Sequence, residues 1–319
     1  MVRIATRGSA LARWQATRVA ELLQGAGPGS GVAFAGEELV GVGFVGVEFV
    51  VVETSADRRL DLPIEQLGGQ GVFVKEVQAA VLDGRADVAV HSAKDLPSAT
   101  APGLALASIP ERDDPSDALV GSTLDEMPAG ALVATGSVRR RAQLAWTRPD
   151  LTFTGLRGNI ATRLAHARPD QVVVVAAAAL RRLGLLDRAD EILAPEIMLP
   201  QVAQGALAVE CRADDDRTLA LLAAIDDPRA HRAVRAERGF LARLGGGCDL
   251  PVGALAVEEP SGEIVIEGML ASADGHILLR SRQRGALGED PAALGARLAE
   301  FLSVQAAGAD LLIDVAARS

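Results

Sequence analysis

The sequence is poor in aromatic residues and in cysteine. Among its 319 residues there is no tyrosine, and aromatic residues make up 3%. The two cysteines, Cys211 and Cys248, are too few for a disulfide framework and are typical of a reducing compartment. The longest apolar run, residues 172–180, is half the length that a membrane span needs, and the N-terminus has no apolar segment of signal-peptide length. We therefore expect a cytoplasmic protein with no membrane partner.

Lysine is also scarce. Of the 32 basic residues only Lys75 and Lys94 are lysines, and the rest are arginines. A lysine is a compact point charge and an arginine is a planar fork, so the two are not interchangeable. The two lysines lie within twenty residues of each other. Either this spacing is due to chance, or the segment contains positions where a point charge is required and an arginine fork is unsuitable.

The bulk composition limits the class of protein. The net charge of −10 argues against a nucleic-acid partner, although a local basic site is still allowed. Hydrophobic residues make up 49% of a chain that is too long for one ordinary core. Two or three domains built from helices and buried parallel strands suit this composition.

A strand–turn–helix pattern occurs twice along the chain. Residues 2–6 predict a strand, and a helix is expected over residues 10–23. Residues 132–135 predict a second strand, and a helix is expected from about residue 138. This repeat predicts two similarly built lobes, each presenting a helix N-terminus. The chain from about residue 229 predicts a smaller α+β domain, while residues 25–46 predict a loop or an added hairpin without recognisable chemistry.

Arginines are concentrated in the second of these lobes. Residues 131–170 contain seven arginines and two aspartates, which reverses the charge of the chain as a whole. Arg139 and Arg140 begin a helix, where cations oppose the helix dipole. An anionic ligand at that helix start would bind both the backbone N–H groups and the guanidinium forks. The alternative is a solvated basic helix face.

A polar cluster follows the predicted strand over residues 86–91. Ser92, Lys94 and Asp95 come directly after the strand, where open α/β sheets bind their ligands. A carboxylate in this place can handle protons or stabilise a developing cation. The alternative is a surface turn with an ion pair.

Cys248 follows three glycines, so other groups can approach its backbone closely. An accessible thiolate is a good nucleophile. The alternative is a small buried hydrophobic residue, which is what we expect of Cys211 in its apolar strand. His91 and His166 have no partners at metal-ligand spacing, and neither a phosphate loop nor a dinucleotide fingerprint is present.

Seven short motifs in chain order resemble those of the porphobilinogen deaminase family, also called hydroxymethylbilane synthases. Together they extend over nearly the whole chain. They are residues 3–7 (RIATR), 71–76 (GVFVKE), 91–97 (HSAKDLP), 137–140 (SVRR), 156–159 (LRGN), 204–206 (QGA) and 246–248 (GGC).

The resemblance implies an α/β fold with two periplasmic-binding-protein-like lobes around a cleft, plus a small α+β C-terminal domain. On this basis lobe 1 would contain residues 1–110 with 203–224, lobe 2 residues 111–202, and the C-terminal domain residues 225–319. It also implies a transferase that condenses four porphobilinogen molecules head to tail with loss of ammonia, giving the linear tetrapyrrole hydroxymethylbilane. We expect such an enzyme to be a monomer.

The resemblance further implies a dipyrromethane cofactor, held by a thioether to Cys248. Asp95 would be the catalytic residue, holding pyrrole nitrogens and stabilising a cation. Lys75 would belong to a substrate loop. The groups expected to bind the carboxylates and edges of the cofactor are Arg7, Ser9, Ser92, Lys94, Thr135, Ser137, Arg139, Arg140, Arg157, Gly158, Arg163 and Gln204.

Some positions depart from the family pattern. Gln70 stands where Lys is frequent, Ala56 where Gly is frequent, and Gly136 where Ser is frequent. The segment 25–46 is also longer than usual. The sequence also allows two other functions. One is a non-enzymatic anion-binding protein with the same two lobes, which leaves Cys248 unexplained. The other is a regulatory domain that senses a small anion.

Overall fold

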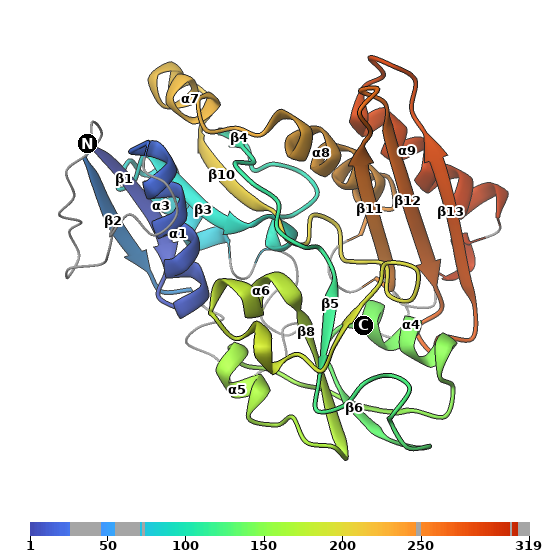
Figure 1. Ribbon diagram of the computed structural model, residues 1–319. Coiled ribbons are helices and arrows are strands. Elements are labelled where there is room, and N and C mark those ends of the chain that lie inside the picture. Colours follow the sequence, from blue (N-terminus) through green and yellow to red (C-terminus); the bar gives the residue numbers. More distant parts are fainter. Residues whose placement is uncertain (26–45, 55–70, 72–73, 247–249, 307, 312–319) are drawn as a thin grey trace. The chain divides into compact units, whose positions relative to one another are not determined.

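The computed structural model describes residues 1–25, 46–54, 71, 74–246, 250–306 and 308–311 (Figure 1). It divides into two compact units, one formed by residues 1–112 and 206–231, the other by residues 113–205 and 232–319. The first unit is called lobe 1. Within the second unit, residues 113–205 are called lobe 2 and residues 232–311 the C-terminal region.

Lobe 1 is built on a five-stranded sheet in the order β2-β1-β3-β10-β4. β1, β2 and β3 are parallel, and β10 runs antiparallel to its neighbours β3 and β4. The elements in chain order are β1 (Val2–Arg7), α1 (Ala10–Leu23), β2 (Val47–Val52), α3 (Lys75–Leu82), β3 (Val88–Ser92), the 3₁₀ turn η2 (Ala93–Asp95), β4 (Leu104–Ser108), β10 (Leu207–Arg212) and α7 (Asp216–Ala223).

Strand alternation distributes the apolar residues of lobe 1 to both faces of this sheet. Ile4 packs in one cluster with Val19 of α1 and Leu222 of α7. The next residue, Ala5, packs in another cluster with Val77 of α3. The sheet is therefore a buried middle layer, with α1 and α7 on one face and α3 on the other.

Lobe 2 repeats this topology with the strand order β7-β6-β8-β5-β9. β6, β7 and β8 are parallel, and β5 is antiparallel to β8 and β9. Its elements are β5 (Asp117–Val120), β6 (Leu132–Ala134), α4 (Val138–Thr147), β7 (Thr152–Thr154), α5 (Ile160–Leu164), β8 (Gln171–Ala176), α6 (Ala177–Arg182), η3 (Leu186–Arg188) and β9 (Glu191–Leu193). The prediction of two similarly built lobes is confirmed.

The C-terminal region contains a three-stranded antiparallel sheet with helices, as predicted for an α+β domain. It contains most of α8 (Pro228–Arg243), and then β11 (Val252–Glu258), β12 (Ile264–Ala271), β13 (Leu278–Arg284), α9 (Pro291–Glu300) and the π turn η4 (Phe301–Gln305). Figure 1 shows β11, β12 and β13 side by side with α9 alongside them. Asp290 caps α9, and Pro291 occupies the first turn, where a missing N–H costs nothing.

Lobe 2 and the C-terminal region form one compact unit because they share contacts. Arg141 donates from Nη2 to the carbonyl of Ala273 at 3.0 Å, and Arg280 donates from Nη1 to the carbonyl of Glu196 at 2.7 Å. Apolar residues of α4 and β12 also share a cluster. The three-domain division inferred from the resemblance therefore stays a prediction, because contacts join two of its three parts.

Candidate functional site

A cavity of about 60 Å³ in lobe 1 lies where the polar cluster was predicted, at the carboxyl ends of β1 and β3. Four predicted site residues line it together: Arg7, Ser9, Ser92 and Asp95. Its remaining lining residues are Leu11, Ala12, Gln15, Val74, Val90 and His91. A cation, two hydroxyls and a carboxylate therefore face one small volume.

The two serines of this cavity are held by α1. Ser9 caps the helix, and its Oγ accepts from the N–H of Ala12 at 3.3 Å. Gln15 donates from Nε2 to Ser92 Oγ at 2.7 Å. Gln15 was missed by the sequence analysis, although a polar residue on the buried face of a predicted helix was a usable signal.

Asp95 and Lys94 lie in η2, directly after β3. Both are half-buried, and Asp95 faces the cavity while Lys94 is not among the residues that line it. Leu96 returns to extended backbone, as expected before Pro97. Lys75 is exposed in the first turn of α3 and does not line the cavity, so its predicted role in a substrate loop stays a prediction.

A buried polar group that was not predicted from the sequence lies behind the cavity. His91 Nε2 is 3.3 Å from Glu210 Oε2, and Gln78 donates from Nε2 to the same oxygen at 2.8 Å. The side chains of His91 and Glu210 are 4% and 1% exposed. His91 also lines the cavity, so this group connects the cavity with the interior of lobe 1.

The predicted arginine pair of lobe 2 is buried around an aspartate. Arg139 donates from Nη2 to Asp117 Oδ2 at 2.7 Å, and Arg140 donates from Nη2 to Asp117 Oδ1 at 2.7 Å. Nη1 of each arginine donates to a backbone carbonyl, that of Leu199 for Arg139 and that of Val174 for Arg140, and Arg140 Nε donates to Asp117 Oδ1 at 3.1 Å. The alternative of a solvated helix face is wrong for these two arginines, because they are 3% and 6% exposed.

The charges in this cluster determine the protonation of Asp117. Burial by itself would raise the pKa of its carboxyl, but the charges of Arg139 and Arg140 outweigh it and hold that pKa well below its ordinary value. Gln204 donates from Nε2 to Asp117 Oδ1 at 2.9 Å. Asp117 thus occupies the position between the two guanidinium groups that the sequence analysis assigned to a ligand carboxylate. Binding of a cofactor by Arg139, Arg140 and Gln204 stays a prediction.

The other predicted residues of lobe 2 lie in two loops. Thr135 Oγ1 accepts from the N–H of Ser137 at 3.2 Å, and Ser137 in turn caps α4. Between them, a Cβ built on Gly136 would lie 3.0 Å from the carbonyl oxygen of Leu156, so a serine here requires a small shift of that loop. Gly136 therefore suits the close approach of these two loops.

The loop before α5 carries Arg157, Gly158 and Arg163. Gly158 has φ +109°, a conformation that favours glycine, and its carbonyl accepts from Arg163 Nε at 2.8 Å. One terminal nitrogen of Arg157, Nη1, is buried and has no hydrogen-bond partner among the described residues. Such an N–H is costly to leave unpaired, and the carboxylate of a ligand would satisfy it.

Of the two cysteines, Cys211 lies among the described residues and Cys248 does not. Cys211 is completely buried, as predicted, and burial raises the pKa of its thiol to about 11. Such a thiol is unreactive at neutral pH. Cys248, Gln70, Ala56 and most of segment 25–46 lie outside the described residues.

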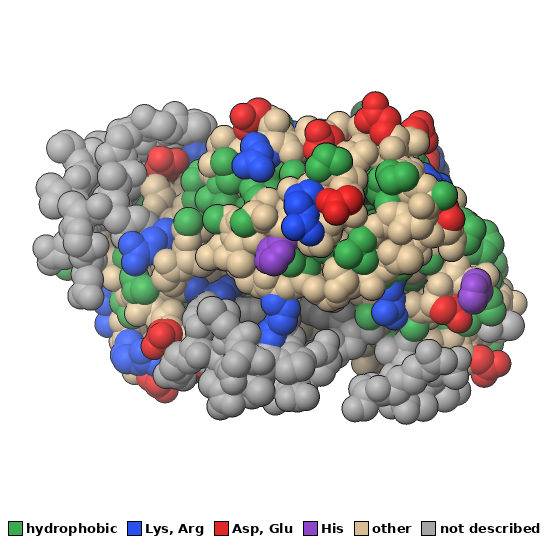
Figure 2. All heavy atoms as spheres, turned by 90° about the horizontal axis from the view of Figure 1, so that it is seen from below, with side chains coloured by type: hydrophobic (Ala, Val, Ile, Leu, Met, Phe, Trp, Pro, Cys, Tyr) green, Lys and Arg blue, Asp and Glu red, His purple; other side chains and the backbone are tan. Residues whose placement is uncertain are grey.

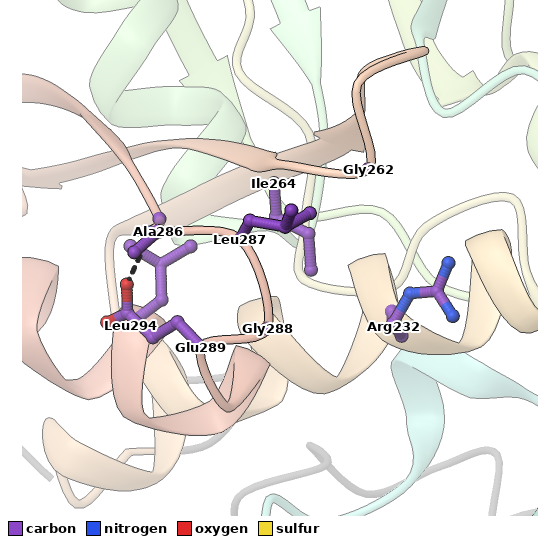
Figure 3. Close-up of a pocket in the computed structure, with 9 residues that line it drawn as sticks. Arg232, Gly262, Ile264, Ala286, Leu287, Gly288, Glu289 and Leu294 are labelled. Carbon is purple, nitrogen blue, oxygen red and sulfur yellow. Dashed lines mark hydrogen bonds between the residues drawn. The ribbon is translucent and has the colours of Figure 1, made fainter.

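A larger cavity, of about 280 Å³, lies in the C-terminal region, and none of the predicted site residues that the structure describes lines it. Figure 3 shows it between the loop of Leu287 and Gly288 and the side chains of Ile264 and Leu294, with Arg232 at one side. Arg232 is engaged by Glu258 through two bonds of 2.6 Å, and Glu289 accepts from the N–H of Ala286. Its charged groups thus have partners, unlike the buried Nη1 of Arg157.

The surface is mixed in character. Figure 2 shows acidic, basic and apolar side chains interspersed on one face. Among the described residues, none of the helices combines the length and the apolar character that crossing a membrane requires.

These residues fit the carboxylate-rich cofactor that the sequence resemblance implies. In lobe 2, Arg157 offers an unsatisfied buried N–H. In lobe 1, taken by itself, the cavity offers Arg7 with two hydroxyls beside Asp95. Cations and hydroxyls are the donors that carboxylates require. Each lobe, taken by itself, therefore presents donors that suit the acidic side chains of a pyrrole ligand.

Comparison with known proteins supports the same identification. Residues 2–220 match the family model described as porphobilinogen deaminase, dipyromethane cofactor binding domain, and residues 231–303 match the model of the porphobilinogen deaminase C-terminal domain. The porphobilinogen deaminase of Roseiflexus castenholzii is 47% identical over 314 residues, covering 97% of each chain. That of Brevibacillus brevis is 43% identical over 319 residues, covering 98% of this chain and 97% of the relative.

Solved structures with a similar chain path include the VFT2 domain of BvgS from Bordetella pertussis, with a TM-score of 0.38, 14% identity and coverage of 74% of this chain and 91% of that one. Another is an arginine-specific periplasmic binding protein of Salmonella typhimurium, with a TM-score of 0.35, 13% identity and coverage of 70% and 90%. The family models cover most of the chain, and the relatives exceed 40% identity over nearly all of it. The chain belongs to the porphobilinogen deaminase family.

Proposed function

We propose that this chain is a porphobilinogen deaminase that condenses four porphobilinogen molecules into hydroxymethylbilane for tetrapyrrole biosynthesis. The observation that carries the proposal is the lobe 1 cavity, which unites Asp95 with Arg7, Ser9 and Ser92 in a member of this family. In each condensation the C–N bond of an aminomethyl group breaks, ammonia leaves with the electron pair, and a C–C bond joins two pyrroles. Positive charge develops on the incoming pyrrole as ammonia leaves.

Asp95 is the residue placed to respond to that charge. Its carboxylate accepts hydrogen bonds from pyrrole N–H groups and stabilises the cation electrostatically. Arg7 binds acidic side chains of the substrate, while Ser9 and Ser92, the latter fixed by Gln15, donate hydrogen bonds. Lys94 adds a second cation close to Asp95 in sequence.

Cys248 would hold a dipyrromethane through its thiol, and that cofactor would supply the pyrrole carbon that the first substrate joins. In this proposal Arg157 and Arg163 bind its carboxylates in lobe 2, and Thr135 and Ser137 contribute hydroxyls. Gly158 gives the arginine loop its shape. Arg139, Arg140 and Gln204 complete the set, with Asp117 fixing the directions of their side chains.

The enzyme works in the cytoplasm as a monomer with porphobilinogen as its small-molecule partner. An anion-binding protein without catalysis is the competing function. It needs no covalent cofactor, so the state of Cys248 separates the two proposals.

The test is an intact mass of the purified protein followed by peptide mapping. We expect an added mass of two linked pyrrole units on the peptide that contains Cys248, and none in a Cys248→Ala variant. Cys211→Ala is the matched control, and it retains the adduct because Cys211 is completely buried. A wild-type chain that stays unmodified after incubation with porphobilinogen would favour the anion-binding protein instead.

A further inference from the structure

His91 is the one imidazole among the residues that line the Asp95 cavity. It lies on β3 next to Ser92, and alternation along the strand directs the two side chains to opposite faces of the sheet. Ser92 receives its hydrogen bond from α1, and His91 lies on the α3 face. The imidazole side chain is 4% exposed, so it contacts the cavity with little of its surface.

Glu210 lies beside the inner edge of this imidazole, and Gln78 holds the carboxylate of Glu210. Ala208 pairs with His91 in the sheet, which places Glu210, two residues further on, diagonally across from His91 on the same face. Glu210 Oε2 is 3.3 Å from His91 Nε2 and accepts from Gln78 Nε2 at 2.8 Å. The His91–Glu210 contact has the distance of an ion pair, but its angle is too poor for a hydrogen bond. Such contacts are often loose before substrate binds.

A buried carboxylate beside Nε2 selects the tautomer of the ring. It favours a proton on Nε2, and this leaves the electron pair of Nδ1 available on the other edge of the ring. The charged groups around the ring are Glu210 from β10, Arg7 from β1 and Asp95 from η2, while α3 contributes Gln78 and carries Glu76 in its first turn. The imidazole therefore lies between a buried carboxylate and the reaction cavity.

The proposed reaction requires a proton acceptor in this cavity. When the C–C bond forms, the attacking pyrrole carbon still carries its hydrogen, and the ring regains aromaticity only when that proton leaves. Asp95 is already assigned to the pyrrole N–H groups and the cation. Porphobilinogen units added in one cycle provide the attacking carbon in the next, so the acceptor must be regenerated each time.

We propose that His91 is a catalytic base, whose Nδ1 takes the proton from the attacking pyrrole carbon while Glu210 and Gln78 hold the ring in the required tautomer. The C–H electron pair returns to the pyrrole ring, and the imidazolium then gives its proton to the released ammonia, which leaves as ammonium. No oxidant or further reactant is needed. This inference rests on the proposed function and adds a second residue to it.

The tautomer can be measured without turnover. The chain has four histidines, so ¹⁵N-labelled imidazoles can be assigned by comparison with His91→Gln. At pH 8 we expect His91 to show a protonated Nε2 and an unprotonated Nδ1 in the wild type, with this preference weakened in Glu210→Gln. A proton on Nδ1 in the wild type would overturn the proposal, whether or not the protein consumes porphobilinogen.

The kinetic test uses porphobilinogen carrying deuterium at its free α-carbon. In His91→Gln we expect kcat to fall about 100- to 1000-fold. KM should change by no more than a few fold, and the protein should still carry the full mass of the cofactor. A primary isotope effect on kcat should appear, because proton removal becomes the slow step. The exposed His166→Gln, in lobe 2, is the matched control and keeps wild-type rates.

If His91 had only a structural role, the same experiments on His91→Gln would give different results. His91→Gln would then lose cofactor mass or thermal stability, or lose activity without an isotope effect, and each of these outcomes contradicts a base at this position. Full turnover by His91→Gln contradicts it as well. A wild-type protein that does not consume porphobilinogen would instead overturn the proposed function, and the NMR result would still decide the state of the ring.

Discussion

The two lobes share one topology, but the partners that surround a buried carboxylate differ between them. Each has an acidic residue on its antiparallel strand, Asp117 on β5 and Glu210 on β10. Asp117 is neutralised by two guanidinium groups, which are always charged. Glu210 is paired with an amide and an imidazole, whose charge depends on pH. The same framework therefore supports a carboxylate held by two fixed cations in lobe 2 and one without a fixed cation among its described partners in lobe 1.

The position of each cluster relative to its sheet explains this difference. In lobe 2, Arg139 and Arg140 turn from the start of α4 into the interior and become part of the core. In lobe 1, Arg7 and Ser9 occupy the corresponding strand–helix turn and face a cavity. We infer that the turn in lobe 1 serves the reaction, and that the pair in lobe 2 first serves the fold.

The largest expected effect on stability comes from Asp117→Asn. Two buried guanidinium groups would lose their countercharge, and breaking such a cluster costs about 3–5 kcal/mol. Urea unfolding followed by circular dichroism measures the change. Asp150→Asn is the control, because its ion pair with Arg148 lies at the surface, and its unfolding midpoint should not move. Equal midpoints for the two variants would show that the Asp117 cluster does not stabilise lobe 2.

A smaller effect on stability is expected from Glu210→Gln. The imidazole of His91 can become neutral, so no permanent charge is left buried, and we expect a loss of about 1–2 kcal/mol in the same urea assay. Glu300→Gln is the control, since its carboxylate is exposed and 3.7 Å from Arg243. A loss as large as that of Asp117→Asn would remove the contrast between the lobes.

The fold was largely predictable from the sequence where elements are long and periodic. The helix expected over residues 10–23 is α1, with the same bounds, and the helix expected from about residue 138 is α4, which begins at Val138. The short strands β4, β5 and β9 and the helix α7 were not predicted, because three to eight residues carry little periodic signal.

The site was predictable in its residue types and less so in its partners. Arg7, Ser9, Ser92 and Asp95 were named from motifs and share a cavity in the structure. The neutralisation of Arg140 by Asp117, 23 positions away, and the bond from Gln78 to Glu210, 132 positions away, could not be foreseen. A sequence shows which charges need a partner, but only the sheet register shows which residues meet.

The central claim is that lobe 1 carries the chemistry at Asp95, and turnover of porphobilinogen by Asp95→Ala tests it most directly. The measurement is the rate of hydroxymethylbilane formation, with Asp83→Ala, an exposed aspartate of the same lobe, as the control. We expect Asp95→Ala to lose essentially all turnover while its circular dichroism spectrum and urea midpoint stay those of the wild type, and Asp83→Ala to be fully active. Normal turnover by a folded Asp95→Ala would contradict the account.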